Sequence, residues 1–569
     1  MTLRVTKTKR RAARTPLDAI DLDVRWNQLI TLVDEAAYAV QRTSMSKVVV
    51  EGADFGVLLY DRSGRLIASD FSIASKISTD SILASKLLEV FPPDTLVPGD
   101  VLVTNNPWWI MGHLNDIGFV APLFAHGSLV GFAESMAHMA DIGGCLSAQP
   151  RELFEEGLIV PPLKALEAGR ENKTFFDMLE ANVRVPKQVL SDVRALISGC
   201  RVLEAKVVEF LDQHDMENLD DLGGAILEHS QTSMRRAIAQ TIPQGTYHGM
   251  SSVDSPDGPI EIHAHVRVSG GNVCVDFTGT ALQRDYGINS TLVYTYVWST
   301  FTIKCLCLPH LPNNAGTFAP ITVTAPPGTL VNPNFPAPVK MKPVTGHYIP
   351  AAILDALGEV VPTRMLAESG KKSLLYLTGR NVAGEPFSDL TFVNGGMAAR
   401  ATKDGLHSMS FPGNTSAMPV EVLEAVTPIR VNHRRIRPDS GGIGRFRGGC
   451  GTDFEFESVS PVPLTVQAEH GKLETAPKGI RGGGSGATGA TFLNGAVVPD
   501  KIPLNLCKGD VMRMLTPGSG GAYPASERDP NAVQRDIDDG VVTMAAAARD
   551  YSIVKRAKSR RRRGKVLRG

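Results

Sequence analysis

The chain of 569 residues is long enough to form more than one hydrophobic core, because single domains usually hold about 100 to 200 residues. Hydrophobic residues make up 43% of the chain and charged residues 21%, which is typical of globular proteins. No apolar run reaches the length of about 18 residues that a membrane-spanning helix requires. We therefore expect a globular protein of two or more domains, with no membrane association.

The formal net charge of zero hides a separation of charge along the chain. Residues 1–15 carry six Lys and Arg, residues 551–569 carry nine, and neither segment contains an acid. The remainder holds 44 basic and 59 acidic residues. We expect basic, disordered tails at 1–16 and 551–569 that contact an acidic partner chain or stay solvated, rather than bind nucleic acid. No apolar segment follows Arg10-Arg11, so we do not expect an export signal. We expect a cytoplasmic location.

Hydrophobic spacing predicts long helices and short strands between residues 17 and 245, which we take as the first domain. The expected helices cover residues 23–44, a segment starting near 79, 189–210 and 222–242, and the expected strands lie near 56–59 and 66–68. Residues 246–550 are expected to be β-rich, with a hairpin of Ile260–Val268 and Asn272–Phe277 and one helix at 344–361. The fold class is therefore mixed α/β (α+β) and multi-domain.

Two features of this second region are open to a functional interpretation. His263 and His265 share one face of the first hairpin strand, as metal ligands could, but no partner is evident nearby, so a solvent-facing pair is favoured. The glycine-rich stretches 441–451 and 482–489 contain no GxxxxGK[ST] pattern. We interpret them as tight turns between strands rather than as nucleotide-binding loops.

The clearest chemical signal is a spacing that occurs twice, His113-Leu-Asn-Asp116 and His138-Met-Ala-Asp141. The apolar runs 117–124 and 128–136 lie between the two copies and are joined at Ala125-His126-Gly127, which predicts a β-hairpin. Folding the hairpin at this turn pairs position i with position 253 minus i. Asp116 then faces Ala137, which is the neighbour of His138. Two imidazoles and one or two carboxylates then meet at the open end of the hairpin, as in a divalent metal site.

The same segment resembles the B subunits of the hydantoinase/oxoprolinase type and the related subunits of acetone and acetophenone carboxylases. The resemblance follows a pattern of GDV, NDP, HLxD, a hairpin and HxxDxGG, which here spans Gly99 to Gly144. It continues in order through Glu156-Gly157-Leu158, Asn182–Pro186, Asp276–Thr280, Asn313–Gly316, Asp439–Gly449, Thr516–Gly521 and Glu527–Pro530, ending at Tyr551. It implies a divalent transition metal (Zn, Mn or Fe) on His113, Asp116 and His138.

Two positions depart from the family pattern. The usual NDP is Asn105-Asn106-Pro107, so that an amide replaces a carboxylate. A His that the family carries upstream is missing from the segment Ser72–Ser78. Both changes leave the expected fold unaffected but point to a divergent substrate or an altered activity.

The resemblance also implies a division of labour. A separate A-type subunit uses Mg-ATP to phosphorylate the amide of a lactam or hydantoin, and the B-type subunit completes hydrolysis with a metal-activated water. We therefore expect a hetero-oligomeric amidohydrolase that is active only with this partner. In this chain Asp141 or Glu134 would orient or deprotonate the water, and Asn106 would donate a hydrogen bond.

Two alternatives remain open at this point. The chain could serve a ketone carboxylase that uses bicarbonate, although such subunits tend to be longer. It could also be a non-catalytic scaffold that keeps the metal as a structural clip. Retention of both HxxD units favours an enzyme, whereas the altered NDP and the missing His favour the scaffold.

Overall fold

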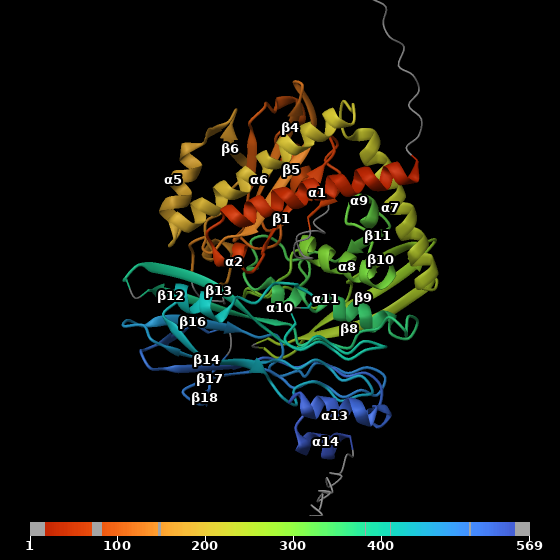
Figure 1. The fold of residues 1–569 in the computed structure, drawn as a ribbon, viewed down its shortest axis with the longest axis vertical. Coiled ribbons are helices and arrows are strands. Elements are labelled where there is room, and N and C mark those ends of the chain that lie inside the picture. Colours follow the sequence, from red (N-terminus) through yellow and green to blue (C-terminus); the bar gives the residue numbers. More distant parts are fainter. Residues whose placement is uncertain are drawn as a thin grey trace, which may run out of the picture.

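The computed structural model describes residues 18–70, 82–145, 150–255, 257–381, 383–409, 411–499 and 502–551. Apart from Tyr551, the predicted basic tails lie outside these residues, as does the segment 72–78 where the family His is missing. Among the helices of the described residues, none combines the length and apolar character needed to cross a membrane. Within this part of the chain the strands form four separate sheets and helices lie between them in the sequence, which confirms the mixed α/β fold class (Figure 1).

The N-terminal part is built around a seven-stranded sheet with the order β2-β1-β5-β4-β3-β6-β7. Its strands are β1 (Phe55–Tyr60), β2 (Leu66–Ser69), β3 (Val101–Thr104), β4 (Asp116–Ala125), β5 (Ser128–His138), β6 (Leu163–Glu167) and β7 (Arg170–Glu171). Its helices are α1 (Ala19–Thr43), α2 (Lys47–Val50), α4 (Ile82–Val90), α5 (Lys173–Asn182), α6 (Pro186–Gln213) and α7 (Asp220–Thr241), with 3₁₀ turns at Pro93–Thr95 and Leu153–Glu155. The predicted hairpin and the predicted long helices are therefore confirmed.

Both faces of this sheet are buried, which is why its central strands are apolar without alternation. On one face α1 and α6 pack against β4, β5 and β1, as Figure 1 shows. On the other face, alternate residues such as Val120, Phe132 and Met136 join a second core with the middle part of the chain. The end of the β4–β5 hairpin is thus enclosed by segments that are distant in sequence.

The register of the hairpin differs by one residue from the predicted one over most of its length. Next to the turn the prediction is right, since Phe124 faces Leu129. A bulge at Leu123/Phe124 then adds one residue, so that Leu123 faces Gly131 and Asp116 lies directly opposite His138. The bulge therefore brings the two side chains closer than the simple fold-back predicts.

The middle part starts a new four-stranded sheet at Gly245, with the order β11-β10-β9-β8. Its elements are β8 (Gly245–Val253), β9 (Ile260–Ser269), β10 (Asn272–Asp276), α8 (Leu292–Cys307), α9 (Ala315–Phe318), β11 (Ile321–Thr324), α10 (Lys342–Gly346) and α11 (Ile349–Leu357). The predicted β9–β10 hairpin is confirmed. A domain boundary near residue 245 stays a prediction.

The prediction of a single helix at 344–361 is wrong, because the structure forms two short helices there. Helix α10 ends at Gly346 and α11 begins at Ile349, with Pro350 in its first turn. Proline has no N–H and fits only the start of a helix, so a continuous helix through this position would lose a hydrogen bond. The break lets Lys342 at the start of α10 contact Asp116 at the hairpin end, while α11 packs on β8 and β9.

The C-terminal part contributes two further sheets, of orders β13-β12-β16-β19 and β14-β15-β20-β17-β18. Its elements are β12 (Lys372–Arg380), β13 (Pro386–Asn394), α12 (Val420–Val426), β14 (Ile429–Ile436), β15 (Thr452–Ser458), β16 (Leu464–Glu469), β17 (Ala490–Leu493), β18 (Ala496–Val497), β19 (Leu504–Leu506), β20 (Val511–Leu515), a 3₁₀ turn at Ala525–Glu527, α13 (Pro530–Asp538) and α14 (Met544–Asp550).

The glycine-rich stretches of this part pack backbone against backbone. A Cβ atom on Gly442 would lie 2.2 Å from the carbonyl oxygen of Gly484, and one on Gly518 would lie 1.7 Å from that of Ser440. Neither 441–451 nor 482–489 leads into a helix, so neither has the strand-loop-helix form of a nucleotide loop. The interpretation as tight turns is incomplete, because these glycines serve close contact between distant segments.

Candidate metal centre

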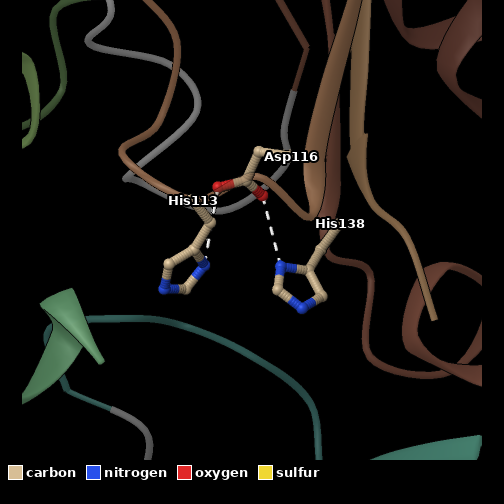
Figure 2. Close-up of side chains that lie close together, drawn as sticks. All are labelled: His113, Asp116 and His138. Carbon is tan, nitrogen blue, oxygen red and sulfur yellow. Dashed lines mark hydrogen bonds and ion pairs between the residues drawn. The ribbon is translucent and has the colours of Figure 1, made fainter. Parts of the chain in front are cut away.

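Three side chains meet at the open end of the β4–β5 hairpin (Figure 2). Asp116 begins β4, His138 ends β5 directly opposite, and His113 lies in the turn that leads into β4. The His138 Nδ1 atom is 3.3 Å from Asp116 Oδ1, and His113 Nδ1 is 3.7 Å from Asp116 Oδ2. All three side chains are buried.

This donor set fits a divalent metal ion. One donor atom from each residue can be chosen such that all three lie within 4.8 Å of one another. Two imidazoles with one carboxylate suit Zn, Mn or Fe and leave coordination positions open. Among the residues that the structure describes, no other group of three or more His, Cys, Asp or Glu has this geometry.

A buried lysine from α10 completes the immediate surroundings of Asp116. The Nζ atom of Lys342 donates to Asp116 Oδ2 at 2.8 Å and lies 4.5 Å from the centre of the Tyr294 ring. Gly112 leaves room for this side chain, since a Cβ there would lie 2.9 Å from Lys342 Cδ, and its φ of +82° favours glycine. This ion pair therefore helps to fix the orientation of the Asp116 carboxylate.

Two cavities flank the imidazoles, and both carry positive side chains. One is lined by His113 and His138 together with Asp141, Glu156, Arg184, Lys340, Tyr376 and Gln467, among others. The other is lined by the three donor residues together with Asp54, Tyr294, Lys342, His347 and Lys372, among others. Burial, together with the charges of Lys372, Lys371 and Lys342, lowers the pKa of His347 well below its usual value. Each cavity therefore presents two basic and two acidic side chains around the donor set.

Glu156 is a carboxylate of the first cavity whose role the sequence did not indicate. Its Oε1 atom accepts hydrogen bonds from the backbone N–H groups of Val339 and Lys340 at 2.6 and 2.8 Å. Burial raises its pKa to about 7, against the lowering effect of these hydrogen bonds. A cavity carboxyl with a pKa near neutrality is suited to exchanging protons.

Asp141 also lines the first cavity, as the sequence pattern suggests, but it is engaged in an ion pair. Its Oδ1 accepts from the Arg184 guanidinium at 2.6 Å, and its Oδ2 accepts from the backbone N–H groups of Arg184 and Gly143. Its carboxylate is therefore held in place beside the imidazoles. Its assignment as a base stays a prediction.

Glu134 lies away from the donor atoms, on the same face of β5 but four residues before His138. At about 3.3 Å per residue this is about 13 Å along the strand. The Tyr60 hydroxyl donates to Glu134 Oε2 at 2.8 Å, and burial raises the pKa of Glu134 to about 8. Neither cavity that contains His138 includes Glu134 in its lining. The structure therefore does not bring Glu134 to the donor set.

Asn106 serves the turn before the site. Its side-chain oxygen accepts from the backbone N–H of Trp108 at 3.0 Å, and its carbonyl accepts from Trp109 and Ile110. The neighbouring Asn105 ties the same turn to Leu114, Leu158 and Val160. Asn106 is absent from the lining of both cavities. A hydrogen bond from Asn106 to substrate stays a prediction.

The fold and the buried donor set define a protein of mixed α/β architecture with a candidate metal site. Residues 18–523 match the Hydantoinase B/oxoprolinase family, and the chain belongs to that family. A putative D-/L-hydantoinase B-type chain of Pseudomonas sp. (strain NS671) is 28% identical over 94% of this chain and 95% of its own.

Two solved structures share the fold. An ATP-dependent caprolactamase of Pseudomonas jessenii superimposes with a TM-score of 0.88 at 24% identity, over 95% of this chain and 97% of that one. A nucleotide-free acetone carboxylase gives a TM-score of 0.84 at 19% identity, over 94% and 80%. At these identities the two structures establish the common architecture.

Proposed function

We propose that this chain is the B-type subunit of an ATP-dependent amidohydrolase that opens a lactam or hydantoin ring after a partner subunit has phosphorylated the amide. The observation that carries the proposal is the buried set of His113, Asp116 and His138 in a chain of the hydantoinase B family. Relatives named as the B-type chain of a hydantoinase and the beta chain of a caprolactamase support both the reaction class and a hetero-oligomer. The A-type partner would bind Mg-ATP, and the complex would act in the cytoplasm.

The three donor residues would hold a divalent transition metal, whose identity among Zn, Mn and Fe the donor set leaves open. Such a cation lowers the pKa of a water molecule and polarises a carbonyl or phosphoryl oxygen. Lys342 keeps the Asp116 carboxylate turned toward the imidazoles. Burial of the donors limits access of bulk water, which strengthens every electrostatic interaction in the site.

The first cavity supplies groups for an activated, negatively charged substrate. Lys340 and Arg184 provide positive charge in its lining, and Glu156 and Asp141 provide carboxylates. Glu156, with its pKa of about 7, is suited to accept a proton from a water molecule. The Asp141–Arg184 pair is suited to orient that water molecule. Glu134 and Asn106 remain the further proposed catalytic residues, which would have to act from outside this lining.

The test is reconstitution with an A-type subunit. Each subunit alone is expected to leave hydantoin, 5-oxoproline and caprolactam intact, whereas the complex with ATP opens one of these rings. His138→Ala is expected to remove the metal and the ring opening while ATP use by the partner continues. Full metal occupancy in His138→Ala, or ATP hydrolysis by this chain alone, would refute the proposal.

A ketone carboxylase subunit is the second candidate, favoured by the fold that this chain shares with acetone carboxylase. The same complex incubated with acetone or acetophenone, ATP and bicarbonate distinguishes the two. Bicarbonate-dependent product would establish the carboxylase. If removal of the metal abolishes assembly of the complex but the partner still uses ATP, the chain is a non-catalytic scaffold and the metal has only a structural role.

A further inference from the structure

A second cluster of imidazoles lies on the middle sheet, on the face opposite to α11. His263 and His265 alternate along β9 with the buried residues Ile262, Ala264 and Val266, which confirms that the pair shares one face. Strand β8 places His248 directly opposite His265 in the register. The partner that the sequence did not indicate is therefore on the neighbouring strand.

The geometry of the first two imidazoles matches a pair of metal ligands. The Nε2 atom of His248 is 3.2 Å from the Nδ1 atom of His263. Two nitrogens bound to one tetrahedral ion at about 2.0 to 2.1 Å are about 3.3 Å apart. In this structure the contact is a hydrogen bond between the two rings, and its length equals the separation that a tetrahedral ion requires of two nitrogen ligands.

The other nitrogen of His263 has a carboxylate partner. Its Nε2 atom is 3.1 Å from Glu261 Oε2, two residues earlier on the same strand face. A ligating histidine commonly donates its second N–H to a carboxylate, which fixes the ring and leaves the first nitrogen free of its proton. Glu261 therefore favours the tautomer of His263 that presents Nδ1 as a ligand toward His248.

His265 provides the third imidazole. Its ring centre is 4.6 Å from that of His248, and the ring centres of His248 and His263 are 5.4 Å apart. The three imidazoles do not yet place one nitrogen each within 4.8 Å of one another, so the site requires His265 to rotate toward the other two. His248 is exposed and His263 and His265 are partly exposed, which leaves room for this rotation. Water can occupy the remaining position.

We propose that His248, His263 and His265 form a second, surface metal site that takes an imidazole-preferring cation such as Zn²⁺, Ni²⁺ or Cu²⁺. The site is independent of the buried donor set, since it lies on a different sheet. Hard cations such as Mg²⁺ are not expected to bind there, because they prefer oxygen ligands.

The experiment uses the untagged full-length chain, stripped with a chelator and titrated with Zn²⁺ by equilibrium dialysis and elemental analysis. We expect about two ions per chain in the wild type and one in His248→Ala, with at least about tenfold weaker binding at the second site after loss of a ligand. His310→Ala, which removes an exposed imidazole outside the cluster, is the matched control and is expected to keep both ions.

A second measurement does not depend on the occupancy of the buried site. The untagged wild type and His310→Ala are expected to be retained on an immobilised Ni²⁺ column, and His248→Ala and His263→Ala to elute earlier. Equal Zn²⁺ stoichiometry and equal retention of all variants would overturn the proposal. Loss of ring opening in His138→Ala bears only on the buried site, so the two proposals fail separately.

Discussion

Replacing Glu134 by Gln is expected to stabilise the protein at neutral and alkaline pH. The folded carboxyl has a pKa of about 8, raised by burial from an ordinary value of 4.5, while the Tyr60 hydroxyl donates to it. Between these two values the unfolded chain releases a proton that the folded chain retains, so stability falls as the pH rises from about 4.5 to about 8. Glutamine has no proton to release and can still accept from Tyr60.

The size of the effect follows from the same two pKa values. Each pH unit inside the window corresponds to about 1.4 kcal/mol, so the advantage of Glu134→Gln grows from about zero at pH 4 to about 3 kcal/mol at pH 7. Above about pH 8 it is constant. The folded state at pH 7 therefore holds Glu134 as a neutral acid, which fits its place in the core of the sheet.

The assay compares thermal unfolding of the two proteins from pH 4 to pH 9 at constant ionic strength. Glu167→Gln, an exposed change on β6 of the same sheet, is the control and is expected to show no pH-dependent difference. A difference that stays constant with pH would refute the reasoning about burial. If Glu134→Gln gains stability yet abolishes ring opening in the complex, Glu134 is catalytic, as the sequence alone suggested.

Three further changes test the surroundings of the site and the packing of the fold. Asp141→Asn is expected to keep the metal and the assembly but to slow ring opening by about 100-fold, with ATP use continuing; unaltered turnover would leave Glu156 as the base to examine. Lys342→Met removes the ammonium beside Asp116 and is expected to destabilise the metal-free protein by about 3 to 5 kcal/mol, but the metal-loaded protein by clearly less, as measured by melting with and without chelator; equal losses would contradict this role. Gly249→Ala would place a Cβ 2.1 Å from a backbone nitrogen of α11 and should cost at least about 2 kcal/mol, whereas Gly224→Ala, which meets only open space, should not destabilise; a harmless Gly249→Ala in the melting assay would show that α11 can shift.

The part of the site that could be predicted from sequence is the part held by local structure. His113, Asp116 and His138 lie within 26 positions and are joined by one hairpin, whose apolar runs and Gly127 turn are visible in the sequence. The predicted register was wrong by one residue, because a bulge inserts one unpaired residue that simple alternation along the strands does not reveal.

The remaining site residues come from tertiary packing. Lys342 donates to Asp116 although the two residues are 226 positions apart in sequence. Glu156 accepts from the backbone N–H groups of Val339 and Lys340, which are more than 180 positions away. Glu156 stands in a segment of the family resemblance, but its spacing indicates no role. Nothing local marks Lys342, since a lysine at a helix start is ordinarily a solvated side chain. His248 was missed for the same reason, because strand pairing and not spacing brings it to His265.

Because of the bulge at Leu123/Phe124, the position of the donors depends on the number of residues in this hairpin as well as on their types. Side chains alternate between faces along a strand, so removing one residue between the bulge and Gly127 would turn Asp116 toward Ala137 and slide the carboxylate out of line with His138. A single-codon deletion far from the donors would thus be as damaging as losing a ligand, although every ligand would still be encoded. Related chains that keep the three donors should therefore tolerate substitutions in this turn far better than an inserted or deleted residue.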